Sequence, residues 1–409
     1  KIKGSKNLNV PPLRFPEFSG EWKCTTIGNI GDIKNGPFGS VLHAEDYVEN
    51  GIPIVTTEHF KTGLMPSDKF GIPQVSNEDY IRLKGYRLET NDIVFSRVGS
   101  VDINAHVGIE QNGWLFSGRV LRVRPKYDID SLFLHYALST EAVKRDIRNR
   151  AVGQTMPSIN TPILSSTTIQ LPKDLFEQKK VAHFLRLLDE RIITQNKIIE
   201  DLKKLKSAIS KHLFARKDLL ETTICLSNIA TLKNGYAFQS GKYNALGKWK
   251  ILTITNVSGE RYINDEDYNC IINLPNDIQD HQVLKEGDIL ISLTGNVGRV
   301  SLCKDGDYLL NQRVGLLQLA KNVNQEFLYQ ILSSQRFENS MIACGQGAAQ
   351  MNIGKGDVES YVLPYSSNVN NILLVAKILH SYDEYIINEQ RKLTLLTMQK
   401  QYFLAQMFI

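Results

Sequence analysis

The chain has 409 residues, a length that predicts two or three domains. Hydrophobic residues make up 42% and charged residues 22%, as in an ordinary globular protein, and no run of 18 apolar residues predicts a membrane span. The net charge of +5 is too small to indicate a nucleic-acid partner by itself. The five cysteines form no CxxC pair, so we expect no disulfide framework, no zinc site, and a reduced, cytoplasmic setting.

The first half of the chain predicts an arm, a domain and a long helix. Residues 1–21 are a polar lead containing LRFPEF, which we expect to pack on another part of the chain. Residues 22–174 alternate short strand-like runs with turn clusters, which predicts a mixed α/β domain. We expect its strands within 27–33, 52–57, 92–96 and 119–123, and a helix over about 131–148.

Residues 175–216 carry apolar residues at alternating spacings of three and four, the pattern of a coiled-coil seam. A helix over 177–214 would be roughly 57 Å long. The expected seam positions are Leu185, Leu188, Ile192, Gln195, Ile199, Leu202, Lys206, Ile209 and Leu213. Asp174 and Glu177 superficially resemble a nuclease carboxylate set, but their place at the start of the helix favours an interaction with the helix dipole.

The second half of the chain repeats the first. Residues 217–370 restart with LSNIATLKNG, which matches GNIGDIKNG in the first domain, and GDILISLTGNV later matches NDIVFSRVGSV. Residues 371–409 match the first long helix at an offset of 194 without a gap. The second seam is expected at Leu379, Tyr382, Ile386, Glu389, Leu393, Leu396, Lys400, Phe403 and Met407.

Two matched charged features of the helices lead to further predictions. If the helices pair antiparallel about a two-fold axis, Lys206 and Lys400 should each approach the N-terminal half of the other helix. The matched pairs Asp189-Glu190 and Asp383-Glu384 are expected either as solvated charges or as contacts to a partner protein. Between the motifs the two domains match poorly, for example 56–70 against 255–269, so one scaffold carries two different faces.

The order of these motifs and their duplication resemble the specificity subunit of type I restriction–modification systems. The resemblance implies an α+β fold, in which two similar mixed α/β target-recognition domains are separated by two long antiparallel coiled-coil helices in a pseudo-two-fold repeat. It implies that each domain recognises half of a bipartite target in double-stranded DNA. It also implies that the helices set the gap between the two half-sites and dock two modification subunits, which bind S-adenosylmethionine and methylate adenine. Two restriction subunits would complete the complex. The chain itself would hold no cofactor and no metal.

The candidate DNA contacts lie in loops of the poorly matched regions. In the first domain they are Lys34, Asn35, Ser40, Thr57, Glu58, His59, Arg97, Ser100, Gln154 and Thr155. Arg97 suits a bidentate contact to guanine and Glu58 can accept from cytosine, whereas Lys34 and its match Lys233 suit phosphate. In the second domain the candidates are Lys233, Asn234, Tyr236, Gln239, Asn256, Thr294, Asn296, Arg299, Gln346, Gln350 and Asn352.

Each candidate has an ordinary structural alternative. Gly36 and Gly235 can serve only as turns, Arg97 can pair with a local carboxylate, and Tyr236 can belong to the core. Catalytic motifs are missing: there is no N-P-P-(Y/F) or D-P-P-Y tetrapeptide and no phosphate-binding GxxxxGK(S/T) loop. We therefore expect a non-catalytic DNA-binding subunit; the alternatives are a coiled-coil assembly scaffold with protein-binding globular domains, or a stand-alone DNA enzyme, against which the missing motifs count.

Overall fold

The computed structural model describes residues 9–37, 44–345 and 351–409. The chain forms two compact units: unit 1 contains Lys1–Thr194 and Leu393–Ile409, and unit 2 contains Gln195–Lys392. Among the described residues, no helix combines the length and apolarity needed to cross a membrane.

Unit 1 is built on a four-stranded antiparallel sheet with the order β2-β9-β6-β7. These strands are Gly31–Asn35, Val120–Pro125, Ile93–Ser96 and Asn104–His106. A smaller sheet has the order β3-β5-β4-β8, from Tyr47–Val48, Gln74–Val75, Ile52–Val55 and Leu115–Phe116, with β4 and β8 parallel. Strands β1 (Lys23–Thr26) and β10 (Thr168–Leu171) form an antiparallel pair.

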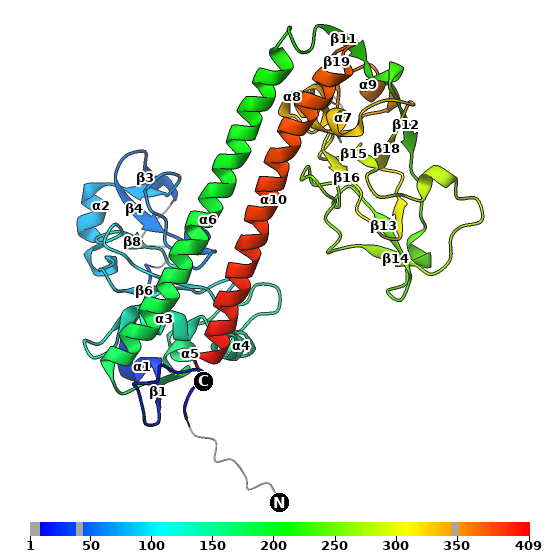
Figure 1. The fold of residues 1–409 in the computed structure, drawn as a ribbon. Helices are drawn as coiled ribbons and strands as arrows, with labels where there is room; N and C mark the ends of the chain where they lie inside the picture. The colour runs from blue at the N-terminus through cyan, green and yellow to red at the C-terminus, as the bar shows by residue number, and fades with distance from the viewer. Residues whose placement is uncertain (1–8, 38–43, 346–350) are drawn as a thin grey trace, which may run out of the picture. The chain divides into compact units, whose positions relative to one another are not determined.

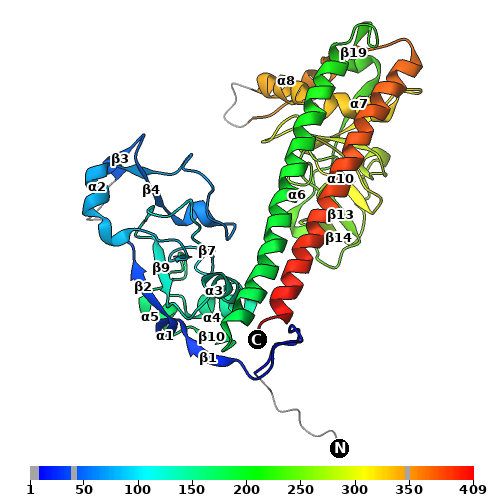
Figure 2. The same ribbon diagram turned by 60° about the vertical axis from the view of Figure 1, so that its left-hand side comes forward.

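The helices of unit 1 are short, apart from its part of the two long helices. They are α1 (Ile27–Ile30), α2 (Asn77–Arg82), α3 (Ser131–Leu138), α4 (Glu141–Arg150) and α5 (Thr161–Ser165), with 3-10 turns at Ala44–Asp46, Thr57–Phe60 and Lys84–Tyr86. Figure 2 shows β1, α1 and β2 in succession, so that β2 leads away from the β1–β10 pair.

Three predicted boundaries in unit 1 are wrong. Residues 27–30 form a helical turn instead of a strand, and Gly28 within this turn lies against Ser165: a Cβ at Gly28 would be 2.0 Å from Ser165 Oγ. The strand predicted at 52–57 ends at Val55. The helix predicted at 131–148 is two helices, and the break follows hydrogen bonds from Ser139 Oγ and Thr140 Oγ1 to carbonyls of α3.

Unit 2 repeats this architecture. Its four-stranded sheet has the order β12-β18-β15-β16, from Ala230–Asn234, Val314–Leu319, Ile289–Ser292 and Val300–Leu302. A three-stranded sheet has the order β14-β13-β17, from Asn269–Ile271, Trp249–Leu252 and Tyr308–Leu310, and β11 (Thr222–Cys225) pairs with β19 (Val362–Tyr365). Its helices are α7 (Gln325–Leu332), α8 (Gln335–Gly345) and α9 (Lys355–Glu359), with 3-10 turns at Leu226–Asn228, Ser240–Lys242 and Asp280–Gln282. The matching strand orders confirm the internal repeat.

Each domain is followed in the chain by a long helix, α6 (Leu175–Ala215) and α10 (Val369–Gln406), coloured green and orange to red in Figure 1. All the predicted seam positions are buried or partly buried, which confirms the three-and-four spacing. In unit 2, Gln195 Nε2 donates to Glu389 O (3.1 Å) and Lys206 Nζ meets Asp383 Oδ1 (2.5 Å). In unit 1, Lys400 Nζ meets Asp189 Oδ1 (2.5 Å). The helices are therefore antiparallel, and Lys206 and Lys400 reach the segments that were predicted for them.

The matched pairs Asp189-Glu190 and Asp383-Glu384 were predicted as solvated charges or as contacts to a partner protein. Glu190 is exposed, but solvation is wrong for the two aspartates, which are buried. Asp189 also accepts a hydrogen bond from Tyr136 OH (2.7 Å) in α3. Asp383 also accepts from Gln330 Nε2 (2.6 Å) in α7 and from Arg261 Nη1 (3.0 Å). Each aspartate thus joins both long helices to the domain of its own unit, and burial without these partners would be costly.

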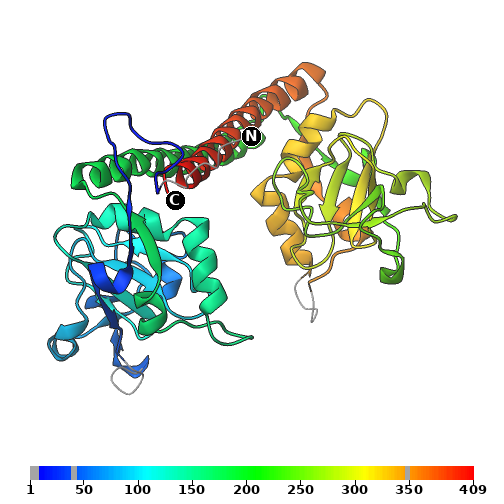
Figure 3. The same cartoon turned by 90° about the horizontal axis from the view of Figure 1, so that it is seen from below.

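The N-terminal arm packs on the end of the helix pair that belongs to unit 1. Arg14 forms a two-pronged ion pair with Glu177, both contacts at 2.7 Å, and Trp22 Nε1 donates to the same carboxylate (3.1 Å). Leu13 N donates to Gln406 O (2.8 Å) at the end of α10, which Figure 3 shows beside the arm. Both acidic residues lie at the start of α6 as predicted: Glu177 is in its first turn, and Asp174 Oδ1 accepts from Phe176 N. The ion pair of Glu177 with Arg14 is an additional contact that was not predicted.

Candidate nucleic-acid interface

Several strand ends of unit 1 meet at one edge. Strand β2 ends at Asn35, which pairs with Leu121, and β6 ends at Ser96, which pairs with Val120 at the start of β9. Strand β4 ends nearby, because Ser117 N donates to Val55 O (2.9 Å). We call residues 35–37, 56–60, 97–100 and 117–119 the turn edge of unit 1.

The turn at 117–120 lies at the centre of this edge and is held by its neighbours. Val120 N donates to Ser117 O (3.0 Å), which closes the turn. A Cβ at Gly36 would be 1.9 Å from Ser117 O, so glycine is needed there for close approach of two backbone segments. Arg97 N donates to Arg119 O (3.0 Å) and Arg97 Nη1 donates to Gly118 O (3.1 Å). Arg97 therefore braces the turn through carbonyls, whereas the structural alternative considered for it was a carboxylate.

Other candidates of the first domain lie on or beside the turn edge. His59 Nδ1 accepts from Thr56 N (3.0 Å), and burial lowers the pKa of His59 even though Glu58 acts in the opposite direction. Glu58 is exposed and pairs with Lys61. The segment of Gln154 and Thr155 is tied to the edge by hydrogen bonds from Gly99 N to Pro157 O (2.8 Å) and from Ile159 N to Arg97 O (2.9 Å). Those two side chains and Ser100 are exposed.

The remaining first-domain candidates are less accessible or lie outside the described residues. Lys34 is partly buried, with its Nζ 5.1 Å from the centre of the Tyr86 ring. Asn35 and Thr57 are partly buried. Ser40 lies outside the described residues.

Unit 2 builds the same edge from matched elements. Strand β12 ends at Asn234, β15 ends at Ser292 and β18 begins at Val314. Val314 N donates to Asn311 O (2.9 Å), and Leu293 N donates to Arg313 O (3.0 Å). A Cβ at Gly235 would be 2.1 Å from Asn311 O, the counterpart of the close approach at Gly36. Residues 234–236, 293–299 and 311–313 form the turn edge of unit 2.

Two candidates of unit 2 are buried, so their side chains cannot make the base contacts that were predicted for them. Asn256 is 2% exposed, and its amide accepts from Thr253 N (2.7 Å) and donates to Asn264 O and Asp267 O (both 2.8 Å). It shapes a loop. Thr294 is 8% exposed and donates to Asn352 Oδ1 (2.9 Å).

The other candidates of unit 2 remain at its surface. Tyr236 OH donates to Asp277 Oδ1 (2.7 Å), and its ring lies 4.8 Å from that of Phe238. Arg299 Nε lies 3.5 Å from Glu338 Oε1, and Lys233 is partly buried. Exposed side chains belong to Asn234, Gln239, Asn296 and Asn352. Gln346 and Gln350 lie outside the described residues.

Sequence reasoning overlooked Arg119 and Arg313, which lie in the two central turns. Their positions differ by 194, the offset of the long helices, so the repeat contained the signal. Both side chains are exposed at their turn edges.

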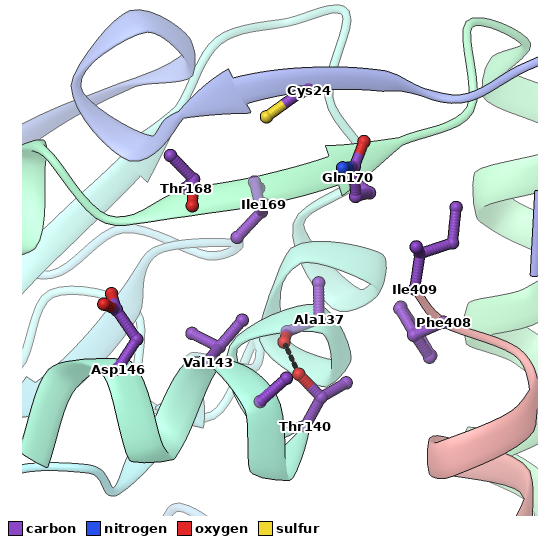
Figure 4. Close-up of a pocket in the computed structure, with 11 residues that line it drawn as sticks. Cys24, Ala137, Thr140, Val143, Asp146, Thr168, Ile169, Gln170, Phe408 and Ile409 are labelled. Carbon is purple, nitrogen blue, oxygen red and sulfur yellow. Dashed lines mark hydrogen bonds between the residues drawn. The ribbon is translucent and has the colours of Figure 1, made fainter. Parts of the chain in front are cut away.

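A pocket elsewhere in unit 1 does not offer a better site. Figure 4 shows Cys24 on β1 and Gln170 on β10 above α4, with Phe408 and Ile409 at one side. Two of its polar groups are engaged within the protein: Thr140 Oγ1 donates to Ala137 O (2.9 Å) and Asp146 pairs with Arg150. Across the parts of the chain that the structure describes, no group of three or more His, Cys, Asp or Glu residues is placed to hold a metal ion.

Comparisons with family models, with curated proteins and with solved structures all find specificity proteins of type I restriction–modification systems. The model of the type I restriction modification DNA specificity domain matches the chain twice, over residues 19–204 and 221–398. The MjaVIII type I restriction enzyme specificity subunit of Methanocaldococcus jannaschii is 28% identical over 354 residues, covering 80% of this chain and 78% of that protein.

Two solved structures share the fold. The S subunit of a type I restriction–modification system from M. genitalium has a TM-score of 0.59 at 17% identity, covering 98% of this chain and 99% of that one. A second structure, which concerns complex assembly and conformational transition of the type I R-M system, has a TM-score of 0.56 at 14% identity, covering 97% and 99%.

Proposed function

Because the chain belongs to the type I restriction–modification DNA specificity family, we propose that its two units recognise the two halves of a bipartite target in double-stranded DNA. We assign recognition to residues 22–174 and 217–370. The observation that supports this most strongly is the turn edge, which is built twice on the same strands and carries different side chains in each copy. Two different half-sites require this combination, whereas a symmetric scaffold would need no difference.

We propose that the chain is a non-catalytic subunit that works in the cytoplasm. The methyl transfer then belongs to modification subunits, which bind S-adenosylmethionine, and cleavage belongs to restriction subunits. Two copies of each, as the family resemblance implies, would complete the complex. This division of labour agrees with the lack of methyltransferase and phosphate-loop motifs in the sequence.

We further propose that the long helices set the gap between the two half-sites and dock the modification subunits. On α10, Leu395, Met398 and Tyr402 follow one another at spacings of three and four, and are 65%, 59% and 58% exposed. They therefore form an apolar stripe on the side away from the seam, and such stripes favour protein partners. Met398→Glu should reduce co-purification with the modification subunit, while Gln399→Glu, which introduces the same negative charge at the exposed neighbouring position, should have a smaller effect.

Domain exchange tests the proposed function. Residues 22–174 are replaced by the corresponding domain of another specificity subunit, and modified adenines are mapped across the genome of cells that carry the intact system. We expect one bipartite motif with a fixed gap before the exchange, and a new sequence in only one half of that motif afterwards. The matched control exchanges residues 217–370, which should change the other half. A change in both halves after a single exchange would contradict the proposal, and a chain that assembles with its partners without directing modification would favour the scaffold.

A further inference from the structure

The central turns of the two turn edges share one charged residue and differ around it. Residues 117–120 are Ser-Gly-Arg-Val, and residues 311–314 are Asn-Gln-Arg-Val. The bracing residue also differs, because Arg97 of unit 1 corresponds to Leu293 of unit 2. The arginine is thus retained in a region where neighbouring surface side chains have diverged.

The backbone presents both arginines in the same way. Arg119 O accepts from the residue that follows β6, and Arg313 O accepts from the residue that follows β15, both at 3.0 Å. Each turn is closed by a hydrogen bond between its first and last residues, at 3.0 Å and 2.9 Å. Both side chains therefore leave a fixed main chain next to the N-terminal end of the central strand, β9 or β18.

The charge of each arginine remains uncommitted. Neither guanidinium forms an ion pair or a side-chain hydrogen bond with a described residue. Other arginines of these units are neutralised: Arg124 pairs with Asp92 (2.8 Å) and Arg261 pairs with Glu326 (2.6 Å). The charge of Arg119 also acts on the Tyr47 phenol. Burial and the charge of Asp46 raise the pKa of Tyr47, and the charge of Arg119 opposes this rise. A phenol does not neutralise a guanidinium, so the charge stays available to a ligand.

We propose that Arg119 and Arg313 are equivalent phosphate contacts, which position the two domains on the DNA backbone without contributing to sequence choice. This inference rests on the proposed function. The two half-sites differ in bases but share the phosphate backbone, so a residue kept in both copies suits the shared part. Arginine matches phosphate because its planar fork donates two parallel hydrogen bonds. Exposed residues that differ at the same edge, such as Ser100 against Asn296, suit base recognition.

The test measures DNA binding by the complex of this chain with its modification subunits. Arg119→Ala and Arg313→Ala are titrated against a duplex that carries the mapped target and against a scrambled duplex, over a range of salt concentrations. We expect each variant to lose roughly tenfold in affinity for both duplexes, as for one charge-assisted contact. The slope of log K against log salt should fall by about 0.9 for each arginine, and Arg119→Lys should keep most of the slope. The modified motif should stay unchanged.

Matched controls remove one positive charge at a distance from the turn edges. Lys23→Ala lies on β1 of unit 1, and Lys217→Ala lies before β11 of unit 2. Both side chains are exposed, and both variants should bind as the unaltered chain does.

Two results would overturn the inference. Relaxed sequence choice at one base pair would make the arginine a base contact, and an unchanged salt slope would remove it from the interface. If the unaltered complex showed no bipartite preference, the proposed function itself would fail, whatever the variants did. Thermal unfolding of each variant should match that of the unaltered chain, because neither side chain bonds to the described protein.

Discussion

At the scale of single residues, the turn edges depend on the absence of a side chain at Gly36 and Gly235. A methyl group at Gly235 would overlap Asn311 O at 2.1 Å, and the backbone on both sides is fixed by the sheet. We expect Gly235→Ala to destabilise unit 2 by about 1–3 kcal/mol, the usual cost of overpacking. Hydrogen exchange of amides in β12 and β18 measures this locally.

Gly356 provides the control, because a Cβ there would meet no heavy atom within 4 Å and the residue lies in α9. Gly356→Ala should be neutral or should stabilise the unit by about 0.5–1 kcal/mol, since alanine favours the helix more than glycine does. Equal effects of the two substitutions would show that close approach does not explain Gly235.

The role of these glycines illustrates what the sequence could predict at this scale. The sequence contains the IKNG and LKNG motifs in matching positions, and these motifs predict a turn or a close approach of the backbone at each glycine. The carbonyl that requires glycine belongs to Ser117 or Asn311, far along the chain, and no local pattern points to it. For the same reason the helix-start position of Glu177 was predicted, whereas its partners Arg14 and Trp22 were not.

At the scale of elements, a buried aspartate links each domain to both long helices. Asp383→Asn should destabilise unit 2 by about 3–5 kcal/mol, because Lys206 would keep a partly buried charge without its partner, while Arg261 would keep Glu326. Adding Lys206→Met removes the uncompensated charge and should recover much of the loss. A double variant no more stable than Asp383→Asn, measured by urea unfolding, would show that Lys206 is not the reason for the cost.

A second prediction at this scale concerns α3, where His135 of unit 1 corresponds to Tyr329 of unit 2. His135 is 5% exposed and its Nδ1 lies 2.7 Å from Asn104 Oδ1. Burial, followed by the charges of His106, Lys400 and Lys144, lowers the pKa of His135 to about 3. The unfolded chain, with a histidine pKa of about 6.5, therefore takes up a proton that the folded chain refuses.

This difference makes unit 1 the more acid-sensitive unit. The stability due to neutral His135 is fully present above about pH 6.5 and is lost as the pH falls towards 3, by up to about 1.4 kcal/mol per pH unit. Between pH 7.5 and 5.5, amide exchange in β6 should reveal a loss of about 1 kcal/mol or more, and amides of β15 should show less. His135→Gln should flatten the dependence in unit 1; an unchanged dependence would assign it to other groups, among them His106, whose pKa burial also lowers.

The elements differ in how well they were predicted. The long helices and their seam followed from local spacing, and the antiparallel placement of Lys206 and Lys400 followed from the repeat. The helix at 131–148 was predicted as continuous because its apolar spacing passes through Ser139 and Thr140, whose hydroxyl bonds to α3 carbonyls end the first helix. The burial of Asp189 and Asp383 could not be predicted from helix spacing, because their partners Tyr136, Gln330 and Arg261 belong to the domains.

At the scale of the whole molecule, the division into two units gives a way to test the proposal that the helices set the gap between half-sites. The units divide between Thr194 and Gln195 in α6 and between Lys392 and Leu393 in α10. We call the ion pairs Asp189–Lys400 and Asp383–Lys206 the aspartate clamps. The first clamp and the domain it holds lie within unit 1, and the second clamp and its domain lie within unit 2. Residues inserted at both division points would therefore leave both clamps intact.

One heptad inserted at each of these points should lengthen the gap and leave the half-sites unchanged. Seven residues keep the seam in phase and add about 10.5 Å of helix, which corresponds to about three base pairs at 3.4 Å each. Mapping of modified adenines should show both half-sites with a gap longer by up to about three base pairs. A heptad inserted only in α6 is the control: it removes the matched length of the two helices, so assembly or modification should be lost. An unchanged gap in the doubly extended chain would show that the helices do not set the spacing.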